Sequence, residues 1–390
     1  MPYTITGGVG LVSQEEKLGR TIAGKSISNY YRLRRGDFAF NKSSTKAHPE
    51  GYIARLHDDV DAAVPSSIFT CFRCVSEEAD GEYLDWLFQS NLHGHWLRKF
   101  ITVGARAHGA LNVNDDDLYA LPVPLPPGKT SRAEQRKIAE CLASLDDWIA
   151  AETDALAALR RHKIGLMQQL FPRPGETRPR RRFPEFQDAK EWEPIPIDKL
   201  ADVTSGGTPS KSNPAYWGGT IPWVSAKDMK TLRLTDSADH VTQVAVDDGA
   251  KLMPAGTLLM LTRGMTLMKD VPICLLQRPM TFNQDVKALS PKPGVIGEFL
   301  AFLLNASKPS LLSLVDIAGH GTGRLNTDEV KQLELAKPEP SEQRRIAGCL
   351  IALDDCIPAR ADSLAALYRH KQGLMHQLFP QLDNRAGGVP

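Results

Sequence analysis

The sequence has few cysteines and no long apolar run. Its 390 residues include six cysteines, of which Cys71 and Cys74 form a single CxxC pair without a second ligand pair, so we expect no metal site. The thiols are interpreted as reduced residues of the core. No segment approaches the roughly 18 apolar residues of a membrane span, and no basic-then-apolar leader is present. We therefore expect neither a membrane span nor secretion, but a cytoplasmic location.

The chain also lacks a strong charge imbalance. Its net charge is +1, with 42% hydrophobic and 24% charged residues, which is ordinary for a protein of two or three domains. A lone DNA-binding protein usually carries more lysine and arginine than this. If the chain binds nucleic acid, its basic residues must gather on one face, or partners must supply part of the phosphate contacts.

Motifs for cofactor binding are missing as well. No FxGxG-type loop follows a strand, and NPAY at Asn213–Tyr216 lacks the second proline of the NPPY motif of amino-methyltransferases. The SGGTPS loop from Ser205 is not followed by Gly-Lys-Ser or Gly-Lys-Thr, as a phosphate loop would be. We interpret both segments as turns, the second shaped by Gly206, Gly207 and Pro209. We expect no catalytic residue and no cofactor.

The chain does contain a long internal repeat. The segment EQRKIAECLASLDDWIAAETDALAALRRHKIGLMQQLFP, residues 134–172, returns without a gap as EQRRIAGCLIALDDCIPARADSLAALYRHKQGLMHQLFP, residues 342–380. The offset is constant at 208 (342 − 134), and about 27 of 39 positions are identical, which indicates a duplication at the scale of a domain.

Each copy of the repeat has the pattern of one long amphipathic helix. Apolar residues recur at steps of four and three over roughly five heptads, and a helix with a single apolar stripe needs a partner. The other copy is the expected partner, in a specific register, because Lys163 and Lys371 interrupt the two seams at the same place. Pro358 predicts a kink or short break in the second helix. The alternative is that the helices are ordinary core elements of two separate domains.

The segments between the helices differ in sequence but share landmarks in the same order. RRGDFAFNKSS from Arg34 matches PAGTLLMLTRG from Pro254 as a turn and strand, and EYLDWLFQS from Glu82 matches EFLAFLLNAS from Glu298 as a short helix. A Gly-rich loop follows in each half. A basic Pro-rich linker after the first helix is interpreted either as a phosphate contact or as a solvated loop.

These patterns predict an α+β chain with two homologous mixed α/β domains, separated by an antiparallel two-helix coiled coil. We expect target-recognition domains at 1–130 and 192–340, long helices at 131–172 and 341–380, a linker at 173–191 and a tail at 381–390. Residues 192–220 have no counterpart in the first half. The first target-recognition domain, 1–130, is therefore expected to be shortened at its start, or its true start is expected to lie upstream.

The repeats, together with SGGTPS, NPAYWGGTIPWVS from Asn213 and FNQDV from Phe282, resemble the specificity subunit of type I restriction-modification systems over nearly the whole chain. The resemblance implies that each target-recognition domain reads one half of a split, asymmetric site in double-stranded DNA. It implies two modification (methyltransferase) subunits that methylate adenine and dock on the duplicated helices, with restriction (translocase-nuclease) subunits added to that core. It implies no catalytic site in this chain.

Candidate DNA contacts are polar residues of the divergent loops, since Arg suits guanine, Asn and Gln suit adenine, and Lys and Ser suit phosphate; they are Asn41, Lys42, Ser43, Lys46, Arg106, His108, Ser210, Lys211, Arg263, Lys269, Gln284, His320 and Arg324. We expect Asn112 and Asn326 to cap or shape their loops instead. Two alternatives remain open: a specificity subunit of another restriction class with a fused methyltransferase-nuclease partner, and a coiled-coil adaptor that binds no DNA.

Overall fold

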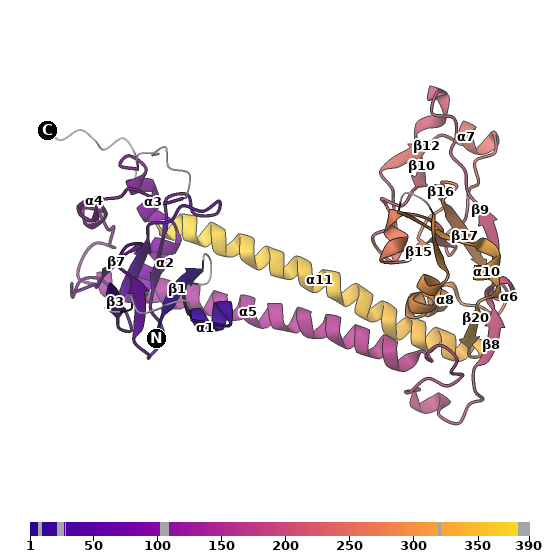
Figure 1. Cartoon of the computed structure of the whole chain (residues 1–390), viewed down its shortest axis with the longest axis horizontal. Helices are drawn as coiled ribbons and strands as arrows, with labels where there is room; N and C mark the ends of the chain where they lie inside the picture. Colours follow the sequence, from indigo (N-terminus) through magenta and orange to yellow (C-terminus); the bar gives the residue numbers. More distant parts are fainter. Residues whose placement is uncertain (7–9, 22–26, 28, 102–108, 319–320, 381–390) are drawn as a thin grey trace. The chain divides into compact units, whose positions relative to one another are not determined.

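The chain forms two compact units, and each long helix contributes to both. The computed structural model describes residues 1–6, 10–21, 27, 29–101, 109–318 and 321–380. Unit 1 consists of residues 1–154 and 361–390, and unit 2 of residues 155–360. The long helices are α5 (Ser131–Leu170) and α11 (Pro340–Leu378). Figure 1 labels the elements of each unit.

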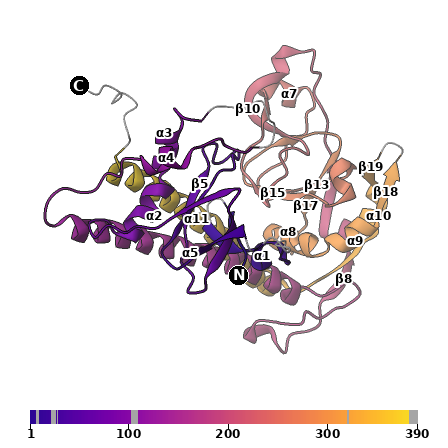
Figure 2. The ribbon, with the colours of Figure 1, turned by 60° about the vertical axis from the view of Figure 1, so that its left-hand side comes forward.

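Unit 2 is built on a five-stranded mixed sheet in the order β11-β15-β13-β17-β9. Its strands are β9 (Ala201–Ser205), β11 (Arg233–Leu234), β13 (Leu258–Leu261), β15 (Ile273–Leu276) and β17 (Val286–Pro291). The apolar helix α8 (Gly297–Ala306) packs on β15 and β17 and buries six consecutive residues from Phe299 to Leu304 (Figure 2). Three smaller sheets complete the strand content described for this unit.

The smaller sheets of unit 2 position its loops. The first joins β10 (Trp217–Val224) with β12 (Asp239–Val241) and β16 (Thr281–Phe282). The second joins β14 (Arg263–Gly264) and β18 (Val315–Ala318) with β19 (Thr322–Leu325). The third joins β8 (Glu193–Pro196) with β20 (Glu334–Lys337). Short helices lie between them: α6 (Ile197–Leu200), α7 (Gln243–Asp247), α9 (Lys308–Ser313) and α10 (Thr327–Gln332).

Unit 1 repeats the centre of this plan in smaller form. Its three-stranded sheet has the order β5-β4-β7, with β4 (Phe38–Asn41), β5 (Tyr52–Arg55) and β7 (Phe69–Phe72). Its helices are α1 (Gln14–Leu18), α2 (Gly81–Gln89), α3 (Leu92–Leu97) and α4 (Asp115–Tyr119). Two further strand pairs join β1 (Tyr3–Thr6) with β2 (Gly10–Ser13) and β3 (Tyr30–Leu33) with β6 (Ala62–Pro65).

The register of the strands confirms that the two units are equivalent. Phe38 lies opposite Phe72 across β4 and β7, and Leu258 lies opposite Leu289 across β13 and β17. Each first strand follows a turn whose glycine has a left-handed φ, 90° at Gly36 and 84° at Gly256, which a residue with a Cβ would strain to adopt. The turn-strand and short-helix matches expected from the sequence are therefore present in both units.

Within each unit, part of α5 packs against part of α11 in antiparallel order. Leu145 and Ile149 of α5 cluster with Leu367 of α11 in unit 1, and Lys371 pairs with Asp146 at 2.6 Å. In unit 2, Lys163 of α5 forms the matching ion pair with Asp354 of α11.

These two ion pairs are related by the sequence repeat. The lysines are 208 residues apart (371 − 163) and the aspartates are 208 apart (354 − 146). Each lysine also lies over an aromatic ring of the equivalent short helix, Lys371 over Trp86 at 4.6 Å and Lys163 over Phe302 at 5.8 Å. The polar residues inside the seams therefore fix the same antiparallel register in both units.

Two expectations from the sequence were wrong in detail. Of the kink or short break expected at Pro358, the break is not formed, because helix α11 continues through this residue. Cys141 is exposed and not a core thiol, whereas Cys274 is buried. Asn326 caps α10 by accepting a hydrogen bond from the Asp328 amide, as expected. In unit 1 the cap of α4 is Asn114, and a loop-shaping role for Asn112 stays a prediction. Among the described residues, no helix is long and apolar enough to span a membrane.

Candidate nucleic-acid interface

A polar hollow of about 430 Å³ in unit 2 brings three of the predicted contacts together: Arg263, Gln284 and Arg324. The two arginines are exposed and directly opposite each other across β14 and β19. Two positive charges in that position repel each other. An anion or a strong hydrogen-bond acceptor bound beside them would reduce this repulsion between the strands. Asp316 lies opposite Arg324 on the other neighbouring strand and offsets one of the two charges.

The hollow contains a further cation, Lys287, that sequence reasoning missed. Its ammonium donates to the Ser205 hydroxyl at 2.7 Å. Burial lowers the pKa of Lys287, and the nearby charge of Lys331 lowers it further. The signal was available in the sequence, because Lys287 directly follows the FNQDV run that contains Gln284.

The SGGTPS loop supports this hollow from one side. The Thr208 hydroxyl donates to the Gln284 side-chain oxygen at 2.6 Å, which orients the amide. A Cβ at Gly206 would lie 2.4 Å from the Phe282 and Asn283 carbonyl oxygens, so only glycine allows the loop to approach the strand this closely. Glycine at position 206 is therefore required by a close approach, whereas the tight turn expected at this loop is not formed by residues 206–210.

The NPAY segment is a turn. Asn213 caps a single 3-10 turn, Pro214–Tyr216, and the Tyr216 hydroxyl donates to Asp248 at 2.8 Å. These contacts hold the turn in place within unit 2, which agrees with the interpretation made from the missing second proline.

The remaining predicted contacts of unit 2 do not line this hollow. Ser210 and Lys211 are exposed on the loop between β9 and β10, where the Ser210 carbonyl accepts from the Trp217 indole at 3.1 Å. Lys269 is exposed after the turn Met265–Met268. His320 lies outside the described residues, as do Arg106 and His108 of unit 1.

In unit 1, Asn41, Lys42 and Ser43 lie together at the end of β4, at the position equivalent to Arg263. Lys42 pairs with Asp115 at 2.7 Å, and the Asn41 side chain accepts from the Ser43 amide at 3.0 Å. Lys46 is exposed on the following loop. Burial would raise the pKa of Asp115, but hydrogen bonds from Lys42 and Thr70 outweigh it and lower the pKa. Lys42 is therefore partly committed to an internal ion pair.

Sequence reasoning also missed the role of the glutamine in each EQR motif. Gln343 is fully buried and makes three hydrogen bonds, accepting from the Ile296 amide at 2.9 Å and donating to the carbonyls of Gly294 and Pro338. Gln135 accepts from the Asp80 amide in the same way and donates to the Glu78 carbonyl, both at 2.8 Å. Each glutamine thus joins the start of a long helix to the segment before the short helix of its unit.

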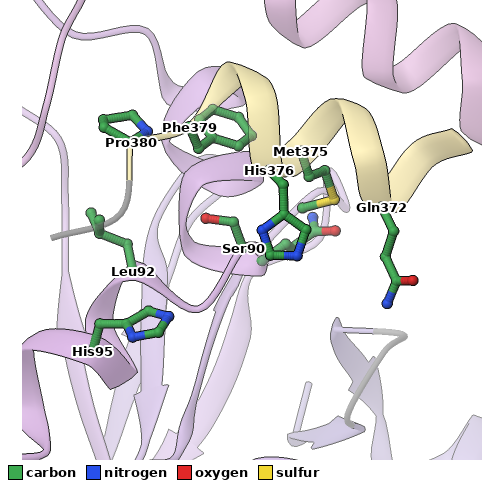
Figure 3. A pocket seen from close by; sticks show the side chains of 9 residues that line it. Ser90, Leu92, His95, Gln372, Met375, His376, Phe379 and Pro380 are labelled. Carbon is green, nitrogen blue, oxygen red and sulfur yellow. The ribbon is translucent and has the colours of Figure 1, made fainter. Parts of the chain in front are cut away.

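A second hollow, of about 190 Å³, lies in unit 1 at the end of α11. Figure 3 shows Gln372, Met375 and His376 from α11 and Phe379 directly after it, opposite side chains from the segment that includes α3. The Phe379 ring meets the Tyr83 ring edge-on at 5.5 Å. The hollow is lined by the ends of packing helices.

The described residues show no cluster suited to metal binding. They contain no group of three or more His, Cys, Asp or Glu side chains that could hold a metal ion. Burial raises the pKa of the Cys71 and Cys274 thiols to about 12, so neither is a thiolate near neutral pH.

Comparison with known proteins identifies the class. Residues 189–367 match the family described as type I restriction modification DNA specificity domain. The specificity subunit of type I restriction enzyme MjaIX from Methanocaldococcus jannaschii is 32% identical over 176 residues, which are 43% of this chain and 39% of that protein. The match therefore spans about two fifths of that relative. The putative MjaX specificity subunit of the same organism is 22% identical over 369 residues, 90% of this chain and 79% of that protein.

The fold agrees with this class. A chain from a solved type I restriction-modification system, described for its complex assembly and conformational transition, covers 97% of this chain and 90% of its own length, with a TM-score of 0.57 and 19% identity. Residues 189–367 therefore match the type I restriction modification DNA specificity domain, and the chain is similar to specificity subunits of type I restriction enzymes.

Proposed function

We propose that this chain is the DNA sequence-recognition subunit of a type I restriction-modification complex. Units 1 and 2 each read one half of a bipartite, asymmetric site, and the chain directs adenine methylation and restriction by its partner subunits in the cytoplasm. The observation that carries the proposal is the Arg263, Gln284, Lys287 and Arg324 hollow, because its donors and acceptors suit base edges and phosphates while it holds no catalytic group.

The difference between the two units supports an asymmetric site. Where unit 2 presents Arg263, unit 1 has Ser43, and the neighbouring Lys42 is held by Asp115. Arginine makes bidentate contacts with guanine, whereas serine and lysine more often contact phosphate. The two half-sites should therefore differ in sequence.

The duplicated helices support two equivalent partners. Exposed residues recur at matching positions on α5 and α11, among them Asp147 with Asp355 and Arg161 with Arg369. Two copies of one modification subunit can bind such surfaces alike, and restriction subunits would add to that core. The small net charge of +1 is consistent with partners that supply part of the phosphate contacts.

The test is DNA binding by the chain assembled with its modification subunits. Arg324→Ala should weaken binding by about 1–3 kcal/mol and relax the sequence preference in one half-site only. Lys251→Ala, which removes an exposed lysine of unit 2 that does not line the hollow, is the matched control and should leave the preference unchanged. Equal losses in both half-sites, or specific methylation without this chain, would refute the proposal.

A further inference from the structure

A pair of residues that face each other across two chain segments differs between the units. In unit 2 the pair is Arg263 and Arg324, in β14 and β19. In unit 1 it is Ser43 and Ala110, which form an isolated antiparallel bridge. All four residues are partly or fully exposed. Unit 2 therefore presents two guanidinium groups where unit 1 presents a hydroxyl and a methyl group.

The backbone around the two pairs shows that they are equivalent. In unit 2 the Leu325 amide donates to the Thr262 carbonyl at 2.9 Å, and in unit 1 the Leu111 amide donates to the Lys42 carbonyl at 2.7 Å. In both units the donor follows the second residue of the pair and the acceptor precedes the first. The two units thus place different side chains on one backbone arrangement.

Both arginines of unit 2 are free to bind a ligand. Within the described part of the chain, the guanidinium groups of Arg263 and Arg324 form no ion pair and no hydrogen bond. The other cation of the hollow, Lys287, already donates to the Ser205 hydroxyl at 2.7 Å. Because like charges directly opposite each other destabilise a strand pair, a ligand rich in acceptors would stabilise this one.

Guanine matches these side chains better than the other three bases do. In the major groove only guanine presents two acceptors side by side, N7 and O6, and these match the two donors of one guanidinium fork. Adenine presents an acceptor and a donor, which suits an amide whose oxygen and nitrogen are both free. The Gln284 oxygen instead accepts from the Thr208 hydroxyl at 2.6 Å. The hollow therefore favours guanine.

The carboxylates of the hollow favour a base over a phosphate. Asp285 and Asp328 line it together with the two arginines. A carboxylate repels a phosphate, whereas it accepts a hydrogen bond from the amino group of cytosine. Arginine and aspartate side chains together thus match the two bases of a G·C pair.

Two arginines require two such base pairs. Residues directly opposite each other on antiparallel strands have Cα atoms about 4.5–5.5 Å apart, and successive bases of one strand are about 3.4 Å apart along the helix axis. Side chains as long as arginine converge over that difference. One guanidinium occupies both acceptors of one guanine, so the second guanidinium needs the guanine of a neighbouring pair.

We infer that Arg263 and Arg324 read two neighbouring G·C pairs in the half-site of unit 2. The inference rests on the proposed function, because it names the bases that are read at the same site. Ser43 and Ala110 have no guanidinium fork, so the equivalent position of unit 1 cannot make this contact.

The first experiment maps methylated adenines for the chain assembled with its modification subunits. Arg263→Ser combined with Arg324→Ala gives unit 2 the pair found in unit 1. This Ser-Ala variant should change one half of the motif, and the wild-type chain should require two neighbouring G·C pairs there. At each of these positions, discrimination against other bases should fall by about 5- to 150-fold. Lys251→Ala, at an exposed lysine outside the hollow, should leave the motif unchanged.

The second experiment replaces each of the two guanines by 7-deazaguanine, which keeps O6 and the base pairing but lacks N7. The wild-type complex should bind this DNA about tenfold more weakly, since a hydrogen bond from a charged donor is worth roughly that factor. The Ser-Ala variant has no fork to lose and should bind modified and unmodified DNA alike. As a control, 7-deazaguanine in the other half-site should affect the wild type and the variant equally.

The variant should fold, because both arginines are exposed and repel each other. The 7-deazaguanine measurement on the wild-type complex needs no variant and decides the question by itself if the variant does not fold. In that measurement, unchanged binding would overturn the inference.

Three other outcomes are decisive. A changed half-site without two neighbouring G·C pairs, or an equal loss with 7-deazaguanine in wild type and variant, would overturn the inference and leave the proposed function in place. Weaker binding of all sequences by the variant, with the same preference and a shallower salt dependence, would indicate phosphate contacts and would overturn the inference too. The proposed function itself fails if the wild-type complex has no sequence preference in either half-site.

Discussion

Gln343→Ala tests whether the glutamine of the EQR motif holds the start of α11 to unit 2. The substitution leaves the Ile296 amide and the carbonyls of Gly294 and Pro338 without their present partner. An unsatisfied buried polar group costs about 1–3 kcal/mol. With two or three such groups, the free energy of unfolding of unit 2 should fall by about 2–9 kcal/mol.

The assay is urea unfolding followed by amide exchange, read separately in α8 of unit 2 and α2 of unit 1. Gln343→Ala should destabilise α8 and leave α2 unchanged, and Gln135→Ala should do the reverse. Gln343→Met keeps the side-chain volume but loses all three hydrogen bonds, so it should cost nearly as much as the alanine variant.

Gln377→Ala is the matched control, because Gln377 is exposed on the same helix, and it should change the stability by less than about 0.5 kcal/mol. The reasoning is refuted if Gln343→Ala costs about 1 kcal/mol or less. It is also refuted if Gln343→Met restores full stability, since packing and not hydrogen bonding would then be responsible.

Three further perturbations have expected outcomes. Arg182→Met leaves the Glu342 carboxylate buried without its guanidinium and should destabilise unit 2 by about 3–5 kcal/mol in urea unfolding; a fully stable variant would contradict the pairing. Exchanging the charges at Lys371 and Asp146 together should recover about 0.5–3 kcal/mol relative to the sum of the single changes, in a double-mutant cycle; strict additivity would argue against the contact. Burial lowers the pKa of His93 from 6.5 to about 4, so the unfolded state takes up the proton first as pH falls. Stability is then complete above about pH 6.5 and is lost toward pH 4, by about 2 kcal/mol at pH 5. His93→Gln should remove that slope in pH-dependent unfolding, and an unchanged slope would exclude His93 as its source.

The long helices and their pairing could be predicted from the sequence because repetition supplies information that one segment lacks. Lys163 and Lys371 interrupt two otherwise apolar seams at one repeat position, and the structure gives each an aspartate at another repeat position. Local signals also sufficed for the glycine turns at Gly36 and Gly256, where φ is left-handed. Of the kink or short break expected at Pro358, the break was wrong, because the surrounding helix continues in spite of the lost backbone donor.

The site was less predictable because it depends on contacts between distant segments. Arg263 and Arg324 were chosen as loop residues, yet they are strand neighbours that face each other. Lys287 was missed although it directly follows the FNQDV run, because a lysine within a strand pattern was not considered as a loop contact. Sequence reasoning assigned no role to Gln135 and Gln343, because the segments that bury both side chains precede the short helices and lie far from the two glutamines in the chain.

The most direct test of the proposed function is a map of methylated adenines in host DNA with and without this chain. With the chain and its modification subunits present, the account predicts methylation at one bipartite motif whose two halves differ in sequence. Replacing Arg263 and Arg324 should alter one half of that motif and leave the other unchanged. Methylation at a contiguous site, or the same map without the chain, would contradict the account.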